Sequence, residues 1–357
     1  MSTTTKHLVV LGAGTAGTMV VNKLRKRLPA TEWSITVVDK DDIHDYQPGY
    51  LFIPFRMNKP GQIRKSKRPY LHDDVEVVMA EVERVDAPAS TVHLVGGRTL
   101  HYDQLVIASG TTPRPDQTPG MLGEQWHREV GEFYTFEGAV ALRAQLDAFT
   151  GGRLVMHITE LPIKCPVAPL EFVFLADDYL KGKGVREATE IVFVTPLDGA
   201  FTKPMASKRL GKLLTQRNIT VETDFMIESV DQDAKVIRSY DEREVPYDQL
   251  VTVPLNMGAD FVAASGLGDE LNYVPVDKHT CRSTQYDDIW ALGDASNIPT
   301  SKAGSVAHFS VDVFVENFQD AVAGRPLSHS FDGHANCFIE SGGGKALLLD
   351  FNYETEP

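Results

Sequence analysis

Cys165 is placed where a nucleotide-binding protein usually has glycine. It lies in the stretch IKCPVAPLE, residues 163–171, between a predicted buried strand at 153–158 and a predicted helix at 170–180. In a nucleotide-binding α/β unit the turn between such a strand and helix is glycine-rich, but this turn contains no glycine. The adjacent Lys164 and the helix N-terminus both favour a thiolate, so we expect Cys165 to have a lowered pKa and to be reactive.

The other candidate reactive side chains are less clear. Cys281 precedes Trp290 in a polar segment without an activating neighbour, and we expect a packed thiol there. The sequence around Cys337, in the C-terminal part, does not by itself indicate whether this thiol is reactive or packed. Glu171, six residues after Cys165, is either a proton carrier or a solvated acid in the first helical turn. Three dispersed cysteines without a CxxC pair do not make a zinc site, and we expect no metal.

The N-terminal part contains the ordered elements of a dinucleotide-binding unit. Glycines in a GxGxxG turn allow backbone N–H groups to approach a pyrophosphate at a helix N-terminus, and an acid at the next strand end accepts from a ribose hydroxyl. The elements are a strand at 7–11, the glycines Gly12, Gly14 and Gly17, a helix at 16–28, a strand at 34–38 and Asp39.

A repeated sequence indicates a second domain of similar construction. YDQLV occurs at 102–106 and again at 247–251. The first copy leads into a small-residue turn containing Gly110, where the chain could cross between domains. We therefore predict an α/β fold with two Rossmann-like domains, the second inserted into the first. The boundaries are 1–112 and 256–325 for the FAD-binding domain, 113–255 for the second domain and 326–357 for a short C-terminal segment with a predicted hairpin.

The second domain lacks the residues that a nicotinamide nucleotide needs. Its first turn has no glycine, and its second strand, at 190–194, ends in Thr-Pro rather than in an acid. For the first domain, Gly293 and Asp294 at the end of a return strand favour FAD over NAD, because such an Asp can bind ribityl hydroxyls. We expect Lys302, at the start of the next helix, to favour an anionic reduced flavin. A helix or turn cap is the other reading of Asp294.

Composition limits the partners. The net charge of −14 argues against nucleic acid and against a wholly electrostatic hold on an anionic membrane. The sequence shows no signal peptide and no run of roughly 18 apolar residues, and it contains three cysteines, so we expect a reducing, cytoplasmic location. A basic run at 56–68 is either a contact for lipid headgroups or a solvated face, and we favour the solvated face.

Four segments together resemble the sulfide:quinone oxidoreductases, which are grouped with the flavocytochrome c sulfide dehydrogenases in the superfamily of flavoproteins with two dinucleotide-binding domains. The segments are 12–17, 46–49, 164–171 and 293–302. The last two are the specific ones, whereas the glycine turn identifies only the superfamily. The resemblance covers nearly the whole chain in order.

The resemblance implies a redox-active pair of cysteines beside non-covalent FAD. Cys165 matches the first cysteine of the pair by its motif, Cys337 matches the second by its place, and Glu171 matches a family carboxylate. It further implies that sulfide attacks the disulfide, that the resulting thiolate passes its electrons to the flavin, and that a quinone accepts them. The third catalytic cysteine of some members is missing upstream of Cys165. A peripheral membrane contact and a homo-oligomer are left open.

Two other functions are compatible with these motifs. A type II NADH:quinone dehydrogenase shares the fold and the acceptor, and it would be reduced by NADH. A flavin-bearing redox sensor or persulfide-binding protein would react with sulfide but turn over little.

Overall fold

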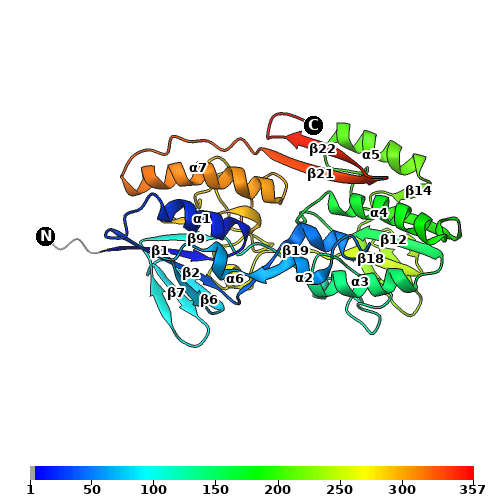
Figure 1. Ribbon diagram of the computed structural model, residues 1–357, viewed down its shortest axis with the longest axis horizontal. Helices are drawn as coiled ribbons and strands as arrows, with labels where there is room; N and C mark the ends of the chain where they lie inside the picture. Colours follow the sequence, from blue (N-terminus) through cyan, green and yellow to red (C-terminus); the bar gives the residue numbers. More distant parts are fainter. Residues whose placement is uncertain (1–4) are drawn as a thin grey trace.

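The computed structural model describes residues 5–357 and has two lobes side by side along its long axis (Figure 1). A five-stranded parallel sheet forms the centre of the first lobe, with the order β20-β9-β1-β2-β5. Its strands are β1 (Lys6–Leu11), β2 (Trp33–Asp39), β5 (Glu76–Met79), β9 (Gln104–Ile107) and β20 (Ile289–Ala291).

Two helices from opposite ends of the chain pack together on the first sheet. They are α1 (Thr15–Arg25) and α7 (Gly304–Val322). Trp290 of β20 is fully buried against Phe314 and Phe318 of α7, which fixes the late helix on the early sheet. The predicted helix at 16–28 ends early, at Arg25, whose guanidinium donates to the carbonyls of Leu28 and Trp33 beyond the helix.

The second lobe repeats this plan. Its parallel sheet has the order β11-β18-β12-β13-β14. The two YDQLV copies form β9 and β18, which occupy the same place in their sheets, second from one edge. The fold class predicted from the sequence is therefore confirmed. The elements are β11 (Val130–Gly131), β12 (Gly152–Ile158), β13 (Thr189–Val194), β14 (Ile219–Glu222), β18 (Gln249–Val253), α3 (Phe136–Ala148), α4 (Ala168–Lys183) and α5 (Pro204–Gln216).

The chain crosses between the lobes on a short antiparallel pair, β10 (Thr112–Pro113) with β19 (Asn256–Met257). Because β20 then returns to the first sheet, we propose the domain boundaries given above.

The smaller elements are β3 (Ile43–Asp45), β4 (Arg64–Ser66), β6 (Val82–Asp86), β7 (Thr91–Leu94), β8 (Thr99–His101), β15 (Ile227–Asp231), β16 (Val236–Ser239), β17 (Glu244–Pro246), α2 (Pro60–Ile63), α6 (Asp260–Ala264) and the 3-10 turns η1 (Gln47–Phe52), η2 (Arg68–Tyr70), η3 (Pro115–Gln117), η4 (Arg186–Ala188) and η5 (Gly293–Ala295).

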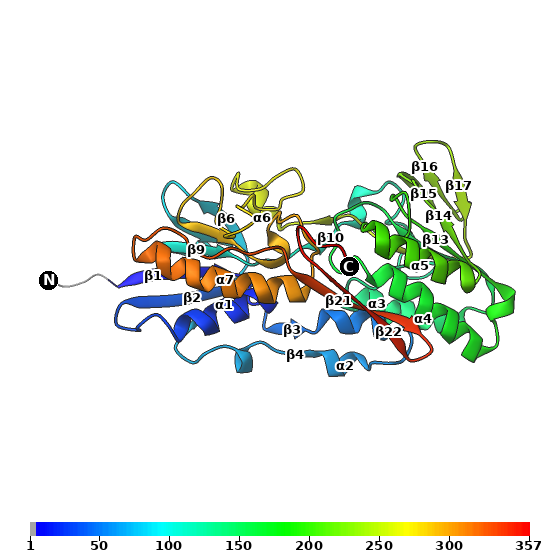
Figure 2. The same ribbon diagram turned by 90° about the horizontal axis from the view of Figure 1, so that it is seen from above.

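The C-terminal segment is the predicted hairpin, formed by β21 (Ala335–Gly342) and β22 (Lys345–Phe351). It runs from the α7 end of the first lobe over α4 of the second (Figures 1 and 2). Cys337 and Ile339 of β21 point inward and are buried, whereas Phe338 between them is exposed. The alternation along β21 thus brings Cys337 to the inner face, between the lobes.

Part of the basic run is neutralised by neighbouring acids. Arg56, Arg64 and Lys67 are paired with carboxylates, which agrees with a structural rather than a lipid-binding role for these three cations. Within residues 5–357, none of the helices combines the length and the apolar character needed to cross a membrane.

Candidate functional site

The glycine turn after β1 is a cradle that larger residues would fill. Gly12 has a φ of +103°, and a Cβ there would lie 2.4 Å from the Ala108 carbonyl oxygen of the neighbouring strand end. A Cβ on Gly17 would lie 1.8 Å from the Gly12 carbonyl oxygen, so only glycine lets α1 approach β1 this closely. The space around Gly14, the first residue before α1, is open. No side chain caps α1 and its first turn has no acid, which leaves its N–H groups for an anion.

Asp39, at the end of β2, closes this cradle. One of its oxygens accepts the Ala13 amide at 2.7 Å, and the other is paired with the Lys67 amine at 2.8 Å. Lys67 is nearly buried, so this ion pair is shielded from water. Sequence reasoning placed Lys67 in a surface basic run and missed this contact, since only the fold brings residue 67 to the end of β2.

Next to the cradle, two polar groups lack a hydrogen-bond partner within residues 5–357, a buried hydroxyl and a half-buried carboxylate. Ser109, beside Gly110 in the turn after β9, has a hydroxyl that makes no hydrogen bond within the described part of the chain. The Asp294 carboxylate in η5 likewise has no hydrogen bond to residues 5–357, and burial raises its pKa while the charges of Lys302 and Lys164 oppose that rise. Unpartnered polar groups of this kind fit a polar ligand between them.

Lys302 differs from its expected role. Its amine donates to the carbonyls of Asp294 at 3.0 Å and Ser296 at 2.9 Å, and it lies 3.6 Å from the centre of the Tyr273 ring. Burial lowers the pKa of this amine to about 8. The amine is therefore occupied inside the protein rather than free to face a reduced flavin, and it fixes the turn that carries Asp294.

These features together fit FAD. The glycine cradle and the α1 N-terminus suit a pyrophosphate, Asp39 suits a ribose, and Asp294 suits the hydroxyls of a ribityl chain. Gly293 is the first residue of the η5 turn, which also contains Asp294.

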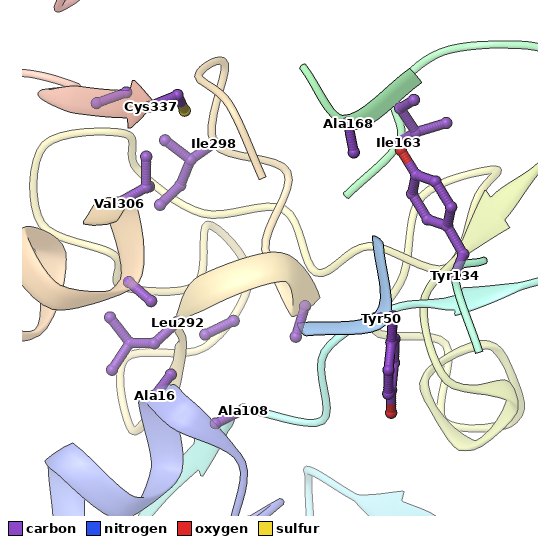
Figure 3. Packing of buried hydrophobic residues seen from close by; sticks show 14 of the residues in the cluster. Ala16, Tyr50, Ala108, Tyr134, Ile163, Ala168, Leu292, Ile298, Val306 and Cys337 are labelled. Carbon is purple, nitrogen blue, oxygen red and sulfur yellow. The ribbon is translucent and has the colours of Figure 1, made fainter. Parts of the chain in front are cut away.

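The Cys165 turn is bonded to the Lys302 segment of the first lobe. The Cys165 amide donates to the Lys302 carbonyl at 2.7 Å, and the Lys164 amide donates to the Asn256 side chain at 3.1 Å. The Tyr134 hydroxyl donates to the Cys165 carbonyl at 3.1 Å, and Figure 3 shows this ring reaching up to the Ile163 and Ala168 turn. Cys165 itself has a φ of +48°, a left-handed conformation that costs a non-glycine residue of order 1–3 kcal/mol.

The predicted lowering of the Cys165 pKa is wrong. Burial raises the pKa of this thiol well above its usual range, and the nearby charges of Glu171, Cys337 and Asp294 raise it further. Burial also lowers the pKa of the Lys164 amine, so Lys164 contributes less positive charge than its sequence position suggests. Desolvation by the two lobes is a tertiary effect, and it outweighs the local effects of a lysine neighbour and a helix end.

Cys337 and Glu171 are brought to the same place by packing of β21 on α4. Glu171 Oε1 accepts the Glu340 amide of β21 at 3.0 Å, and burial raises the pKa of Glu171 to about 7. Burial and the Glu171 charge raise the pKa of Cys337 to about 11. Helix α4, which carries Glu171, begins three residues after Cys165, so the packing of β21 on α4 brings Cys337 toward the Cys165 turn, and Figure 3 shows Cys337 over Ile298 and Val306 of the first lobe.

Cys281 is apart from this cluster and is fully buried in the hydrophobic core, as expected. All three cysteines are free thiols. Among residues 5–357 there is no group of three His, Cys, Asp or Glu side chains arranged to hold a metal ion.

Comparisons with known proteins agree with this arrangement. Residues 6–155 match the family described as pyridine nucleotide-disulphide oxidoreductase. The chain is 24% identical to the mitochondrial sulfide:quinone oxidoreductase of Dictyostelium discoideum over 98% of its own length and 78% of the relative. The crystal structure of the sulfide:quinone oxidoreductase of Aquifex aeolicus superimposes with a TM-score of 0.84 at 21% identity, covering 97% of this chain and 84% of that one.

A type II NADH:quinone oxidoreductase of Staphylococcus haemolyticus is 36% identical, but over only 29% of this chain and 26% of the relative. The resemblance to the sulfide:quinone oxidoreductases therefore extends along nearly the whole chain, whereas this second one is local. The resemblance inferred from the four motifs is confirmed.

Replacing Gly17 by alanine tests the cradle. The added Cβ meets the Gly12 carbonyl oxygen, and we expect the free energy of unfolding to fall by about 1–3 kcal/mol, as for overpacked sites. Gly14→Ala is the matched control, because apart from its two chain neighbours no atom of residues 5–357 lies within 4 Å of the added Cβ. Urea unfolding of the FAD-free proteins measures both, and equal stabilities would contradict the packing described here.

Replacing Glu171 by glutamine tests the electrostatics of the cysteines. Above about pH 7 the native carboxylate is ionised and disfavours a neighbouring thiolate, so its loss should lower the pKa of Cys337 from its value of about 11. The pH dependence of alkylation at Cys337, followed by mass spectrometry, measures the change. The pKa of Cys281, for which Asp277 is the charged neighbour, should stay where it is. If the pH dependence of Cys337 alkylation is the same in Glu171→Gln and in the native protein, the interaction of Glu171 with Cys337 is contradicted.

Proposed function

We propose that this chain is an FAD-dependent sulfide:quinone oxidoreductase that oxidises sulfide to sulfane sulfur at a Cys165–Cys337 pair. One observation carries the proposal: β21, which carries Cys337, packs on α4, whose Glu171 accepts the Glu340 amide of β21 at 3.0 Å, and α4 begins three residues after Cys165. The glycine-free turn that holds Cys165 also leaves no phosphate cradle for a nicotinamide nucleotide in the second lobe.

In the oxidised protein of this proposal, the two cysteines form a disulfide. Hydrosulfide attacks one sulfur, a new S–S bond forms as a persulfide, and the Cys–Cys bond breaks with its electron pair left on the other cysteine as thiolate. Transfer of the outer sulfur to a further nucleophile and loss of two electrons restores the disulfide. FAD, held by the glycine cradle, Asp39 and Asp294, would supply the two-electron acceptor between the cysteines and quinone.

Burial raises the pKa values of both cysteines, so each thiolate is a strong nucleophile but a slow leaving group. Glu171, with a pKa of about 7, can accept the proton that hydrosulfide or the persulfide releases. We propose Glu171 as this proton acceptor, fixed in place by its bond to the Glu340 amide.

We also propose that quinone approaches from the hairpin side. Phe338 and Leu348 are cross-strand partners on the outer face of the hairpin and are 69% and 54% exposed. Two large apolar side chains facing water, with Phe338 next to Cys337 in the chain and Leu348 opposite Phe338 on β22, suit contact with a quinone-bearing membrane surface. A cytoplasmic location and a homo-oligomer stay predictions.

Anaerobic titration of the FAD-loaded protein tests the proposal against both alternatives. Sulfide should bleach the flavin and NADH should not, whereas a type II NADH dehydrogenase would behave in the opposite way. Adding a soluble quinone should then give many turnovers per flavin. Bleaching by sulfide with no turnover would instead indicate a sensor.

Removing either cysteine should abolish sulfide-dependent flavin reduction. Cys165→Ala and Cys337→Ala each leave only one cysteine of the pair, so the Cys165–Cys337 disulfide that hydrosulfide attacks cannot form. Cys281→Ala is the control, because Cys281 lies in the core, and it should keep the native rate. Stopped-flow absorbance measures all three, with chemical reduction of the flavin as the check on FAD content. A near-native rate in Cys165→Ala would exclude the mechanism.

A further inference from the structure

The far end of the hairpin is fastened to α4 by side chains that take no part in the proposed chemistry. Arg217, just after α5, donates to the Ser341 carbonyl of β21. Asp178 of α4 accepts the Gly343 amide at the hairpin turn. Arg217 also donates to Asp178 at 3.1 Å and to the fully buried Asp177 at 2.8 Å. The guanidinium thus joins α4, α5 and the hairpin in one network.

The hairpin backbone is shaped to accept this network. Gly342 has a φ of +76°, and a Cβ there would lie 2.5 Å from Asp178 Oδ2 and 3.0 Å from Arg217 Nη1. Only glycine leaves room for both side chains against the strand end. The contact with Asp178 and Arg217 therefore explains the glycine at 342, whereas Gly343 and Gly344 have φ values of +63° and +67° that glycine adopts readily.

The other end of β21 is fastened to the first lobe. Ser305, in the first turn of α7, donates its hydroxyl to the Asn336 carbonyl at 2.8 Å and accepts the Asn336 amide at 3.2 Å. Cys337 follows directly, between this tie and the one at residues 341–343. Its strand is therefore held at both ends while it crosses between the lobes (Figure 2).

One helix connects both thiols through these ties. Helix α4 begins three residues after Cys165, and its Glu171 and Asp178 accept backbone amides of the hairpin, from Glu340 of β21 and from Gly343 of the turn. These two residues are seven apart, so they lie on the same face of the helix, two turns from each other. The position of Cys337 relative to Cys165 thus depends on a helix with little freedom to bend.

We propose that Asp178 and Arg217 are positioning residues that hold Cys337 within bonding reach of Cys165. The proposal rests on the redox pair proposed above. Disulfide formation between two thiols depends on their effective concentration, which falls when one of them gains conformational freedom. Releasing the hairpin turn should therefore make the disulfide easier to reduce.

Equilibration of the FAD-loaded protein with glutathione measures this directly. The reaction converts the Cys165–Cys337 disulfide and two reduced glutathiones into two protein thiols and one oxidised glutathione. Acid quenching, alkylation and mass spectrometry then give the oxidised fraction. For Asp178→Ala and for Arg217→Lys, we expect the equilibrium to shift toward the dithiol by about tenfold, which corresponds to about 30 mV.

Two further variants separate positioning from general damage. Asp178→Asn keeps an acceptor oxygen for the Gly343 amide and should restore most of the native equilibrium. Lys181→Ala removes another ion pair of Asp177, at 2.6 Å, that makes no contact with the hairpin, and it should leave the equilibrium unchanged. Thermal unfolding of each variant shows whether it is folded.

The outcomes are distinguishable. If no Cys165–Cys337 disulfide forms in the native protein at any glutathione ratio, the proposed redox pair is wrong. If it forms with the same equilibrium in the native, Asp178→Ala and Arg217→Lys proteins, the pair stands and the positioning role is overturned. An equal shift in Lys181→Ala would also overturn it, since the effect would then come from α4 as a whole.

Discussion

The hydrogen bond from the Cys165 amide to the Lys302 carbonyl is the contact on which the site depends. It joins the turn after β12 in the second lobe to the segment that precedes α7 in the first. Lys302 in turn fixes the Asp294 turn through its amine, so a single segment contacts the proposed cofactor site and the proposed reactive thiol. In a nucleotide-binding domain a glycine-rich phosphate loop would follow β12. Here residues 163–167 form a turn that is hydrogen-bonded to the first lobe and carries the Cys165 thiol.

The hairpin supplies what the two parallel sheets cannot. The second cysteine, Cys337, belongs to neither parallel sheet. β21 crosses from α7 to α4 and carries Cys337 between them, and the hairpin is bonded to Ser305 of the first lobe and to Glu171 and Asp178 of the second. The relative position of the lobes and the geometry of the cysteine pair are therefore coupled.

The sequence predicted the parts of this structure that depend on local pattern. The glycine cradle, Asp39 and the repeated strands β9 and β18 all follow from short motifs whose geometry is local. The expected lowering of the Cys165 pKa was wrong because burial raises it, and the Lys302 amine instead donates to the carbonyls of Asp294 and Ser296 in its own lobe. The pairing of Lys67 with Asp39 and the contact of Asp178 with the hairpin join residues far apart in sequence, and no local pattern indicates them.

The central claim is that Cys165 and Cys337 form a disulfide that hydrosulfide opens. Peptide mapping of the oxidised protein without reductant, before and after one equivalent of sulfide under anaerobic conditions, tests it most directly. The account predicts a cross-linked peptide pair containing Cys165 and Cys337, which sulfide separates to leave one of the two peptides heavier by one sulfur atom. Free thiols at both positions in the oxidised protein, or a cross-link that sulfide leaves intact, would contradict it.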